Sequence, residues 1–597
     1  MLLFPLPVLV KTPPLPRLEI QGERMVAPSG QAVTLRGANM GNWLLLEFWM
    51  LGLSDPKNGG YGDQWSFENL LTGRFGAKEK DRMMELYREN FVTERDWRYM
   101  QDAKFNLVRL PFNYRLLEDD EKPYVLKPNA FKWLDRAVDA AERHGMYTIL
   151  DLHGVQGGQT ENDHTGRSGQ NKLWTNEEDQ KRAAWLWTQI AARYKNRSAV
   201  VAYDVFNEPY GGKRDEQVSV FKKLYAGVRK SDPDKLIFAH GHYDGFSHFG
   251  DPKEQGWKNV GFEMHYYPAL FGDSRPVPTA HGQHLAQMEL VEEQQNKLNV
   301  PFLIGEFNAV FAPLAPGIMR RHYDTYAKNG WMATMWSYKV MGGNGGIGGG
   351  NWGLVTNAEP LAKLDVRTAS KAEIEGWMKR LSTIKLMPWA ELMTALTDPN
   401  YVPPALPEPP PAITKVPAND LLPGWDTTDV NAREGGQKLD ADGTIHLFGG
   451  GNDIWGAEDG FRFASQEAKA DFEIEAEVVS LRDTNAYAKA GLMVRGGNEK
   501  DAPMLLLSVF PNGTAQTAFR AKKGVEAVGG EGVDGPLPTR LRLVRKAGKV
   551  EAFAAHGSDW KSLGSFDFAG PVRIGLVALS HDDRQLTEAV YRNVKVK

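Results

Sequence analysis

The sequence of 597 residues contains no cysteine. This absence excludes disulfide bonds, thiolate metal sites and a cysteine nucleophile. It leaves the cellular compartment open, because a secreted protein of this size can fold without disulfide bonds. No apolar run reaches the roughly 18 residues that a membrane helix needs, so we expect no association with a membrane.

A strong excess of charge of either sign is also missing. The sequence has 71 Lys and Arg residues against 75 Asp and Glu residues, a net charge of −4. So nearly neutral a chain lacks the field that attracts nucleic acid or an anionic membrane. The contents of apolar residues (42%) and charged residues (24%) are typical of a soluble globular protein. We therefore expect neither nucleic acid nor a membrane as a partner. We also expect the protein to be a monomer.

Two segments delimit the expected domains. The first ten residues, MLLFPLPVLV, resemble the apolar core of a secretory signal without the basic segment that normally precedes it. We therefore set residues 1–16 apart as a signal remnant or tail and expect a secreted or periplasmic protein. The proline-rich residues 401–419 predict a stiff, extended linker. This linker separates a first domain, residues 17–400, from a second domain, residues 420–597.

In the first domain, short apolar runs alternate with amphipathic stretches. The eight runs are residues 33–40, 105–112, 146–154, 200–209, 235–242, 260–267, 300–307 and 331–339. Stretches such as 131–146 and 179–196 carry apolar residues three and four positions apart, which predicts helices. Apolar strands that alternate with helices are typical of a parallel sheet covered by helices. Eight such units predict a (β/α)8 TIM barrel, with an open doubly wound sheet as the alternative.

Polar side chains cluster near the carboxyl ends of these predicted strands. They are Arg109, His153, Asn207, Glu208, His265 and Glu306. In a barrel, the carboxyl ends of all strands meet at one face, where the loops build the active site. One polar residue at a strand end is an ordinary transition to a loop. Six of them, from five strands, predict a single site at the barrel mouth.

The second domain has the pattern of a β-sandwich. Apolar and polar residues alternate with a period of two, and turns rich in Gly, Asn and Asp separate the segments. These segments are residues 471–479, 491–495, 504–510, 539–545, 549–555 and 572–579. Helical periodicity is nearly absent, so we expect an all-β sandwich. Trp455 and Trp560 are candidate platforms for a sugar ring, with packing in a core or turn as the alternative.

Glu208 and Glu306 are the best candidates for chemistry. They lie near the ends of the fourth and seventh predicted strands, which face each other across a barrel mouth. Glycoside hydrolysis needs one carboxylic acid to protonate the leaving oxygen and one carboxylate to attack the anomeric carbon or activate water. A separation of about 5–5.5 Å gives retention of configuration, and a wider one gives inversion. Because two carboxylates in a poorly solvated site repel each other, the pKa of one rises and it stays protonated.

The motifs NEP at 207–209 and IGEF at 304–307 carry a family resemblance. With the eight predicted strands, they make the first 390 or so residues resemble glycoside hydrolase family 5, a family of barrel glycosidases. The resemblance implies that Glu208 is the general acid/base and that Glu306 is the nucleophile.

The same resemblance implies roles for their neighbours. Asn207 resembles the asparagine that binds the sugar 2-hydroxyl, a contact that strengthens in the transition state. Arg109 resembles the arginine that keeps the nucleophile ionised by charge and hydrogen bonding. Trp336 resembles the tryptophan beneath the glycone sugar. Other positions that match residues lining the glycone site are His153, His265 and Tyr267.

Residues 35–50 and 151–169 are similar to the exo-β-1,3-glucanase branch of this family. That similarity implies that Glu47 binds the glycone sugar, whereas the alternative is a solvated loop carboxylate. The chain differs from this branch because it lacks the cysteines of the fungal members and carries an extra β domain. The β domain resembles concanavalin-like modules found beside glycosidases, which implies either sugar binding or support of the barrel mouth.

We therefore expect a retaining β-glycosidase that acts on an oligo- or polysaccharide, a β-linked glucan. Exo-action on β-1,3-linked glucose is the first expectation. An endo-β-1,4-glucanase is the main alternative, and a glycolipid glucosidase is a more distant one. A non-catalytic carbohydrate-binding protein is the alternative from a different class. No organic cofactor and no metal are expected.

Two further motifs, and the absence of a third, bear on alternative functions. Residues 343–348 match G-x-G-x-x-G, but the sequence that follows is not helical, so we interpret residues 342–350 as a loop near the site. His240 and His242 point the same way on one strand and form a potential metal site with Asp244, but no further ligand is defined. No G-x-S-x-G motif is present, which disfavours a Ser-His-Asp hydrolase.

Overall fold

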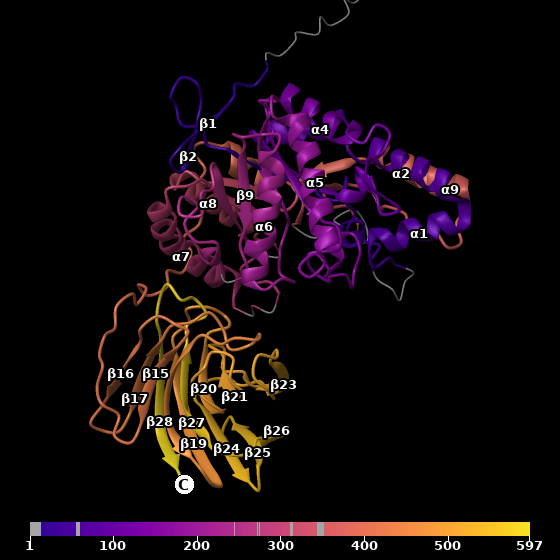
Figure 1. The fold of residues 1–597 in the computed structure, drawn as a ribbon. Coiled ribbons are helices and arrows are strands. Elements are labelled where there is room, and N and C mark those ends of the chain that lie inside the picture. The colour runs from indigo at the N-terminus through magenta and orange to yellow at the C-terminus, as the bar shows by residue number, and fades with distance from the viewer. Residues whose placement is uncertain are drawn as a thin grey trace, which may run out of the picture. The chain divides into compact units, whose positions relative to one another are not determined.

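The computed structural model describes residues 14–54, 60–243, 245–271, 273, 275–310, 314–342 and 352–597. The chain forms two compact units, which are drawn in Figure 1 and described here one at a time. The first unit comprises Met1–Pro268 and Gln287–Leu406, and the second comprises Ala269–Ala286 and Pro407–Lys597.

The first unit contains a closed barrel of eight parallel strands. The strands are β3 (Arg36–Asn39), β4 (Leu107–Asn113), β7 (Tyr147–Gly154), β8 (Val200–Asp204), β9 (Leu236–His240), β10 (Val260–Tyr266), β11 (Phe302–Phe307) and β12 (Met332–Met335). They pair in the order β10-β11-β12-β3-β4-β7-β8-β9. Each predicted apolar run corresponds to one strand, so the predicted barrel is confirmed. Strand β8 is shorter than its run, which places Glu208 in the loop that follows it.

Helices surround this barrel (Figure 1). They are α1 (Gln64–Phe75), α2 (Ala77–Phe91), α3 (Glu94–Asp102), α4 (Lys132–Arg143), α5 (Glu177–Tyr194), α6 (Arg214–Arg229), α8 (Ala315–Lys328), α9 (Lys371–Thr383) and α10 (Ala390–Thr397). Helix α7 (Val277–Leu298) is divided between the units, and its residues from Gln287 onward belong to the first. The two amphipathic stretches singled out in the sequence form α4 and α5. Helix α5 begins where Asn176 accepts hydrogen bonds from the backbone N–H groups of Glu178 and Asp179. Within the described residues, every helix is too short or too polar to span a bilayer.

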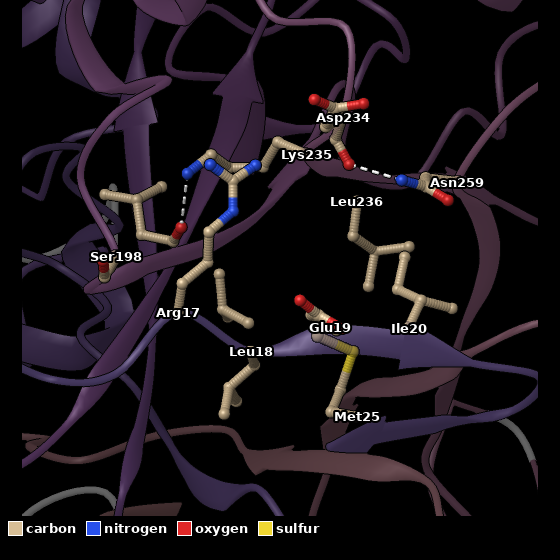
Figure 2. A pocket seen from close by; sticks show the side chains of 12 residues that line it. Arg17, Leu18, Glu19, Ile20, Met25, Ser198, Asp234, Lys235, Leu236 and Asn259 are labelled. Carbon is tan, nitrogen blue, oxygen red and sulfur yellow. Dashed lines mark hydrogen bonds between the residues drawn. The ribbon is translucent and has the colours of Figure 1, made fainter. Parts of the chain in front are cut away.

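A small hairpin lies at the amino-terminal ends of the barrel strands. It consists of β1 (Glu19–Gln21) and β2 (Arg24–Val26), and Met25 belongs to the same apolar cluster as Val201 and Leu236. A cavity of about 370 Å³ lies between this hairpin and the starts of β8 and β9 (Figure 2). In barrel enzymes this end contributes stability, and the chemistry comes from the opposite, carboxyl ends of the strands.

Two short antiparallel pairs complete the first unit. They are β5 (Glu118–Asp119) with β6 (Lys122–Leu126), and β13 (Val355–Asn357) with β14 (Leu386–Pro388).

The second unit contains two seven-stranded antiparallel sheets. One has the strands β15 (Asp426–Val430), β18 (Phe461–Ala468), β27 (Val572–Leu579), β20 (Lys489–Arg495), β21 (Met504–Val509), β22 (Ala515–Arg520) and β23 (Val528–Val533), in this order. The other has β16 (Gly436–Leu439), β17 (Ile445–Gly449), β28 (Thr587–Val596), β19 (Phe472–Leu481), β24 (Thr539–Lys546), β25 (Lys549–Ala555) and β26 (Lys561–Asp567). Apolar residues from both sheets, such as Leu492 and Leu541, form one core. The predicted all-β sandwich is confirmed.

Two strands of the sandwich, β20 and β21, are covered on both faces, unlike β19 and β24 of the other sheet. Strands β19 and β24 show the predicted alternation of buried and half-buried residues. In β20 and β21, by contrast, every residue is buried. The reason is a second apolar cluster on the outer face, where Ile454 and Ala527 pack with Met493 and Leu506. Alternation in the sequence indicates one buried face and does not reveal such a covering segment.

Candidate active site

Glu208 and Glu306 share a small space at the carboxyl end of the barrel. His265, from β10, lies between them. Its Nδ1 atom is 2.8 Å from Oε1 of Glu208 and 3.4 Å from Oε2 of Glu306. One carboxylate oxygen of each glutamate and one nitrogen of His265 all lie within 4.8 Å of one another. The two acids therefore stand within reach of a single sugar carbon.

The backbone of Glu208 has a left-handed conformation, with φ of 38°. A non-glycine residue rarely adopts this conformation unless its surroundings fix it. Two hydrogen bonds do so here. The N–H of Glu208 donates to Nδ1 of His240 (3.1 Å), and its carbonyl accepts from the N–H of Tyr210 (2.7 Å). The loop after β8 thereby aims the carboxyl group at the mouth of the barrel.

The two glutamates differ in their electrostatic surroundings. Glu306 accepts hydrogen bonds from Nη1 of Arg109 (3.1 Å) and from the hydroxyl of Tyr267 (2.6 Å). Burial raises the pKa of Glu306, but the charge of Arg109 and the Tyr267 hydrogen bond oppose that rise. For Glu208, burial and then the negative charge of Glu306 raise the pKa well above its usual value. Glu306 is therefore the more readily ionised of the two, and Glu208 the more readily protonated.

The hydrogen bonds of His265 indicate that the carboxyl group of Glu208 carries a proton. Burial lowers the pKa of this histidine well below its usual value, so its ring is neutral and carries a single N–H. Its Nε2 atom lies 3.1 Å from Oε1 of Glu263. If Nε2–H donates to Glu263, then Nδ1 is an acceptor and the hydrogen bond with Glu208 requires a protonated carboxyl group. This arrangement agrees with the raised pKa of Glu208.

Arg109 is completely buried below the pair and contacts four carboxyl groups. These contacts are to Asp151 (3.1 Å), Asp204 (2.6 Å), Glu263 (3.2 Å) and Glu306 (3.1 Å). Burial raises the pKa values of Asp151 and Asp204 to about 7 against the opposing charge of Arg109. Because one guanidinium cannot balance four buried carboxylates, the cluster retains protons near neutral pH.

Asp151, Asp204 and Glu263 were not predicted as site residues from the sequence. A signal for two of them was present, since Asp151 and Glu263 precede His153 and His265 by two positions. Side chains two residues apart on a strand point to the same face. The inward-facing carboxyl groups could have been found by extending each strand-end motif backward by two residues.

A second chain of contacts runs from Asn207 to Trp336. Asn207 accepts from Nη2 of Arg109 (2.8 Å), and its Nδ2 lies 3.2 Å from Nε2 of His153. Nδ1 of His153 is 2.7 Å from Asp151, and the His153 ring stacks on Trp336 with centroids 5.5 Å apart and planes 18° apart. Burial lowers the pKa of His153 to about 3, so this ring is also neutral. A neutral His153 donates through Nδ1 and accepts from Asn207.

Glu47 is a buried carboxyl group, 7% exposed, and not a solvated loop residue. Its Oε2 atom accepts from Nε1 of Trp49 (2.7 Å), whereas Oε1 is buried without a hydrogen-bond partner in the described residues. Burial, with smaller contributions from the charges of Asp163 and Glu306, raises the pKa of Glu47 to about 8. An unsatisfied buried oxygen is costly, so this atom is suited to a hydroxyl group of a bound sugar.

The short helix η4 (Asp163–Thr165) adds a histidine that the sequence analysis did not select. Nε2 of His164 is 3.5 Å from Oε2 of Glu208 and has no hydrogen-bond partner in the described residues. The amide of Asn113 fixes this helix by donating to the carbonyl of Thr165 (2.9 Å). The structure thus places the nine residues predicted for the site in or beside one network, and adds His164 to them.

Among the described residues, two groups of side chains have the composition of metal ligands. They are His240, Glu263 and His265, and Glu208, His265 and Glu306. Their donor atoms already engage one another, and Arg109 contacts both Glu263 and Glu306. A cation there would be repelled by the guanidinium, so we assign neither group to a metal. Asp244, which follows His240 and His242 in the sequence, and the glycine-rich residues 343–351 lie outside the described residues.

The two tryptophans proposed for the second unit have different surroundings. Trp455 is 42% exposed. The Trp560 ring lies against the guanidinium groups of Arg540 (4.8 Å) and Arg542 (4.6 Å). These cation–π contacts already occupy Trp560, so Trp455 is the better candidate for a sugar platform.

Comparison with known proteins agrees with this geometry. The model of the cellulase family, glycosyl hydrolase family 5, matches residues 76–342. A β-xylosidase of Phanerodontia chrysosporium is 30% identical over 349 residues, covering 55% of this chain and 72% of that protein. A probable glucan 1,3-β-glucosidase A of Emericella nidulans is 27% identical over 317 residues, covering 50% of this chain and 74% of that protein. Among solved structures, the rutinosidase of Aspergillus niger aligns with a TM-score of 0.43 and 16% identity, covering 58% of this chain and 98% of that one.

The fold, the paired carboxyl groups, the match to the family model and the relation to the β-xylosidase define a glycoside hydrolase. The chain belongs to glycoside hydrolase family 5.

Proposed function

We propose that this protein is a retaining β-glycosidase that cleaves β-linked glucan by double displacement, with Glu306 as nucleophile and Glu208 as acid/base. The observation that carries the proposal is the approach of the two carboxyl groups to within 4.8 Å. Retaining glycosidases have their carboxyl groups about 5–5.5 Å apart, whereas inverting enzymes keep them further apart to admit a water molecule.

The different surroundings of the two acids assign their roles. Glu306, held by Arg109 and Tyr267, attacks the anomeric carbon as a carboxylate while the glycosidic bond breaks. Glu208 gives its proton to the departing oxygen. In the second step, Glu208 as a carboxylate takes a proton from water, whose oxygen displaces Glu306 from the sugar. This transfer restores the acid form of Glu208, and the sugar leaves with its original configuration.

We propose exo-action on β-1,3-linked glucose as the reaction. The relative from Emericella nidulans is named as a glucan 1,3-β-glucosidase, and the free Oε1 atom of Glu47 offers a contact for the terminal sugar. Because another relative is named a β-xylosidase, xylosides are the second candidate substrates. Endo-β-1,4 cleavage remains the alternative outcome for the same two acids.

The catalytic proposal is tested with Glu306→Gln and azide rescue. We expect Glu306→Gln to bind laminaribiose but to lose turnover by about 10⁴-fold or more, the scale seen when a nucleophile is removed. In Glu306→Ala, azide can attack from the vacated side and give an α-glycosyl azide. In Glu208→Ala, azide replaces the second-step nucleophile and gives a β-glycosyl azide. Wild-type turnover in Glu306→Gln would exclude the mechanism. Binding of laminaribiose without turnover by the wild-type protein would instead leave carbohydrate binding as the function.

The substrate proposal is tested by product analysis. Laminarin, a cellulose derivative, a mixed-linkage glucan and an aryl xyloside are incubated with the full-length protein. Release of glucose alone from laminarin supports exo-1,3 action. Oligosaccharides from mixed-linkage glucan, or faster cleavage of the xyloside, would replace that proposal.

A further inference from the structure

A stacked pair of tyrosines extends from Glu208 toward solvent. Tyr210 lies two residues after Glu208, and Tyr243 lies in the loop that follows β9. Their ring centroids are 3.7 Å apart and their planes differ by 24°. The Tyr210 ring also stands 6.0 Å from the ring of His240, whose Nδ1 accepts the N–H of Glu208. The pair is thus tied to the loop that carries the proposed acid/base.

Tyr243 is the outer member of the pair and is 64% exposed. Tyr210 covers one face of its ring, so the exposed area includes the other face. Partial burial and then the negative charge of Glu208 raise the pKa of Tyr243 to about 12, which places its hydroxyl group within the field of the acid/base. A large apolar ring that is held in place and left open beside a site is a typical binding surface.

The side of the site on which Tyr243 stands indicates its ligand. A general acid must contact the glycosidic oxygen, which joins the terminal sugar to the leaving group. Groups beyond the acid, away from the nucleophile, therefore face the leaving group. Tyr267 donates to Glu306, and it packs in one apolar cluster with Trp336 and with Trp49, the hydrogen-bond partner of Glu47. Glu47 and Trp336 therefore lie on the nucleophile's side. Tyr243 is placed to meet the leaving sugar.

We propose that the open face of Tyr243 binds the pyranose ring of the leaving group, as a stacking subsite preorganised by Tyr210. This inference rests on the proposed function. The flat C–H face of a β-linked glucose is apolar and matches the face of the phenol ring. Because Tyr210 already restricts the Tyr243 ring, little conformational freedom is lost on binding.

The experiment compares a substrate that has a leaving sugar with one that has none. Laminaribiose places glucose against Tyr243, whereas β-glucosyl fluoride releases only fluoride. We expect Tyr243→Ala to lower the ratio of kcat/KM for laminaribiose to kcat/KM for the fluoride about tenfold, equivalent to about 1.4 kcal/mol. Tyr243→Phe retains the ring and is expected to keep the wild-type ratio. Tyr124→Ala, which removes another exposed tyrosine of the first unit (38% exposed), is the matched control.

Each result has a separate meaning. An unchanged ratio in Tyr243→Ala overturns the subsite while the hydrolase proposal stands, because wild-type turnover is measured in the same assay. An equal loss in Tyr243→Phe also overturns it, since the hydroxyl group and not the ring face would then bind the sugar. If the wild-type protein cleaves neither substrate, the proposed function itself fails. Turnover of the fluoride by each variant shows that its active site is folded.

Discussion

Arg109 donates from Nη1 to Oε1 of Glu306 over 3.1 Å, and the arginine side chain is completely shielded from solvent. The same guanidinium donates from Nη2 to Oδ1 of Asn207 over 2.8 Å. One cation therefore orients both the proposed nucleophile and the amide that precedes the proposed acid. The planar, fixed fork of arginine makes these contacts together, which a lysine cannot do.

Arg109→Lys is expected to lower kcat on laminaribiose by about 10²- to 10³-fold, the scale of a lost preorganised donor. The lysine keeps the charge but leaves Asn207 or Glu306 without its hydrogen bond. Steady-state kinetics measures the loss. Arg197→Lys, at a half-buried surface pair with Asp139, is the control and should keep wild-type kcat. A kcat for Arg109→Lys within threefold of the wild-type value would contradict the orienting role.

Glu47→Leu is expected to lower kcat/KM on laminaribiose by about 10- to 100-fold. The leucine removes both carboxyl oxygens, one of which otherwise meets a sugar hydroxyl. A hydrogen bond contributes about 0.5–1.5 kcal/mol when both groups are neutral and about 1.5–3 kcal/mol when one is charged. Glu47→Gln keeps one acceptor and a donor, so its loss should be smaller. Equal losses in the two variants would show that packing, and not hydrogen bonding, is what Glu47 contributes.

His164→Phe is expected to change the pH dependence of kcat/KM. Catalysis needs Glu306 ionised and Glu208 protonated, so the rate rises with pH through the first ionisation and falls through the second. Nε2 of His164 lies 3.5 Å from Oε2 of Glu208, and a proton on this nitrogen would favour the ionised form of Glu208. Its removal should raise the pKa of Glu208 and move the falling limb to higher pH. The rising limb should stay in place, and an unmoved falling limb would disprove this interaction.

Asp459→Asn is expected to destabilise the second unit by about 3–5 kcal/mol, the cost of breaking a buried charge pair from one side. Asp459 pairs with Arg495 and Arg520, and all three side chains are completely buried. Urea unfolding measures the change. Asp567→Asn, at an exposed pair with Lys549, is the matched control and should change stability by less than about 1 kcal/mol. Similar changes in the two variants would contradict the distinction between buried and exposed pairs.

The sequence was sufficient to predict the barrel and the sandwich, because both depend on the period of apolar residues. The gathering of Glu208, His265 and Glu306 was also predictable, since all strands of a parallel barrel point the same way. What the pattern could not supply was the direction in which each loop turns. The left-handed backbone at Glu208 depends on its hydrogen bond with His240, and the approach of His164 depends on the contact of Asn113 with Thr165. Both contacts join parts of the chain that are distant in the sequence.

The buried carboxyl groups around Arg109 were missed for a different reason. Asp204 is the last residue of β8, and an aspartate at a strand end usually marks the turn toward solvent, because an unpaired buried charge is unfavourable. Here Arg109 offsets that penalty, but it lies 95 positions away in the sequence. Such a partnership is visible only when the strands are assembled.

The backbone angle at residue 208 has a consequence for the evolution of this scaffold. Glycine suits that conformation better than glutamate does, so the reactive side chain is retained there against the local conformational preference. Without selection for turnover, replacement of Glu208 by glycine would increase the stability of the folded protein and abolish its catalytic activity. Homologues that have lost catalytic activity are thus expected to carry glycine at this position while they still keep the barrel.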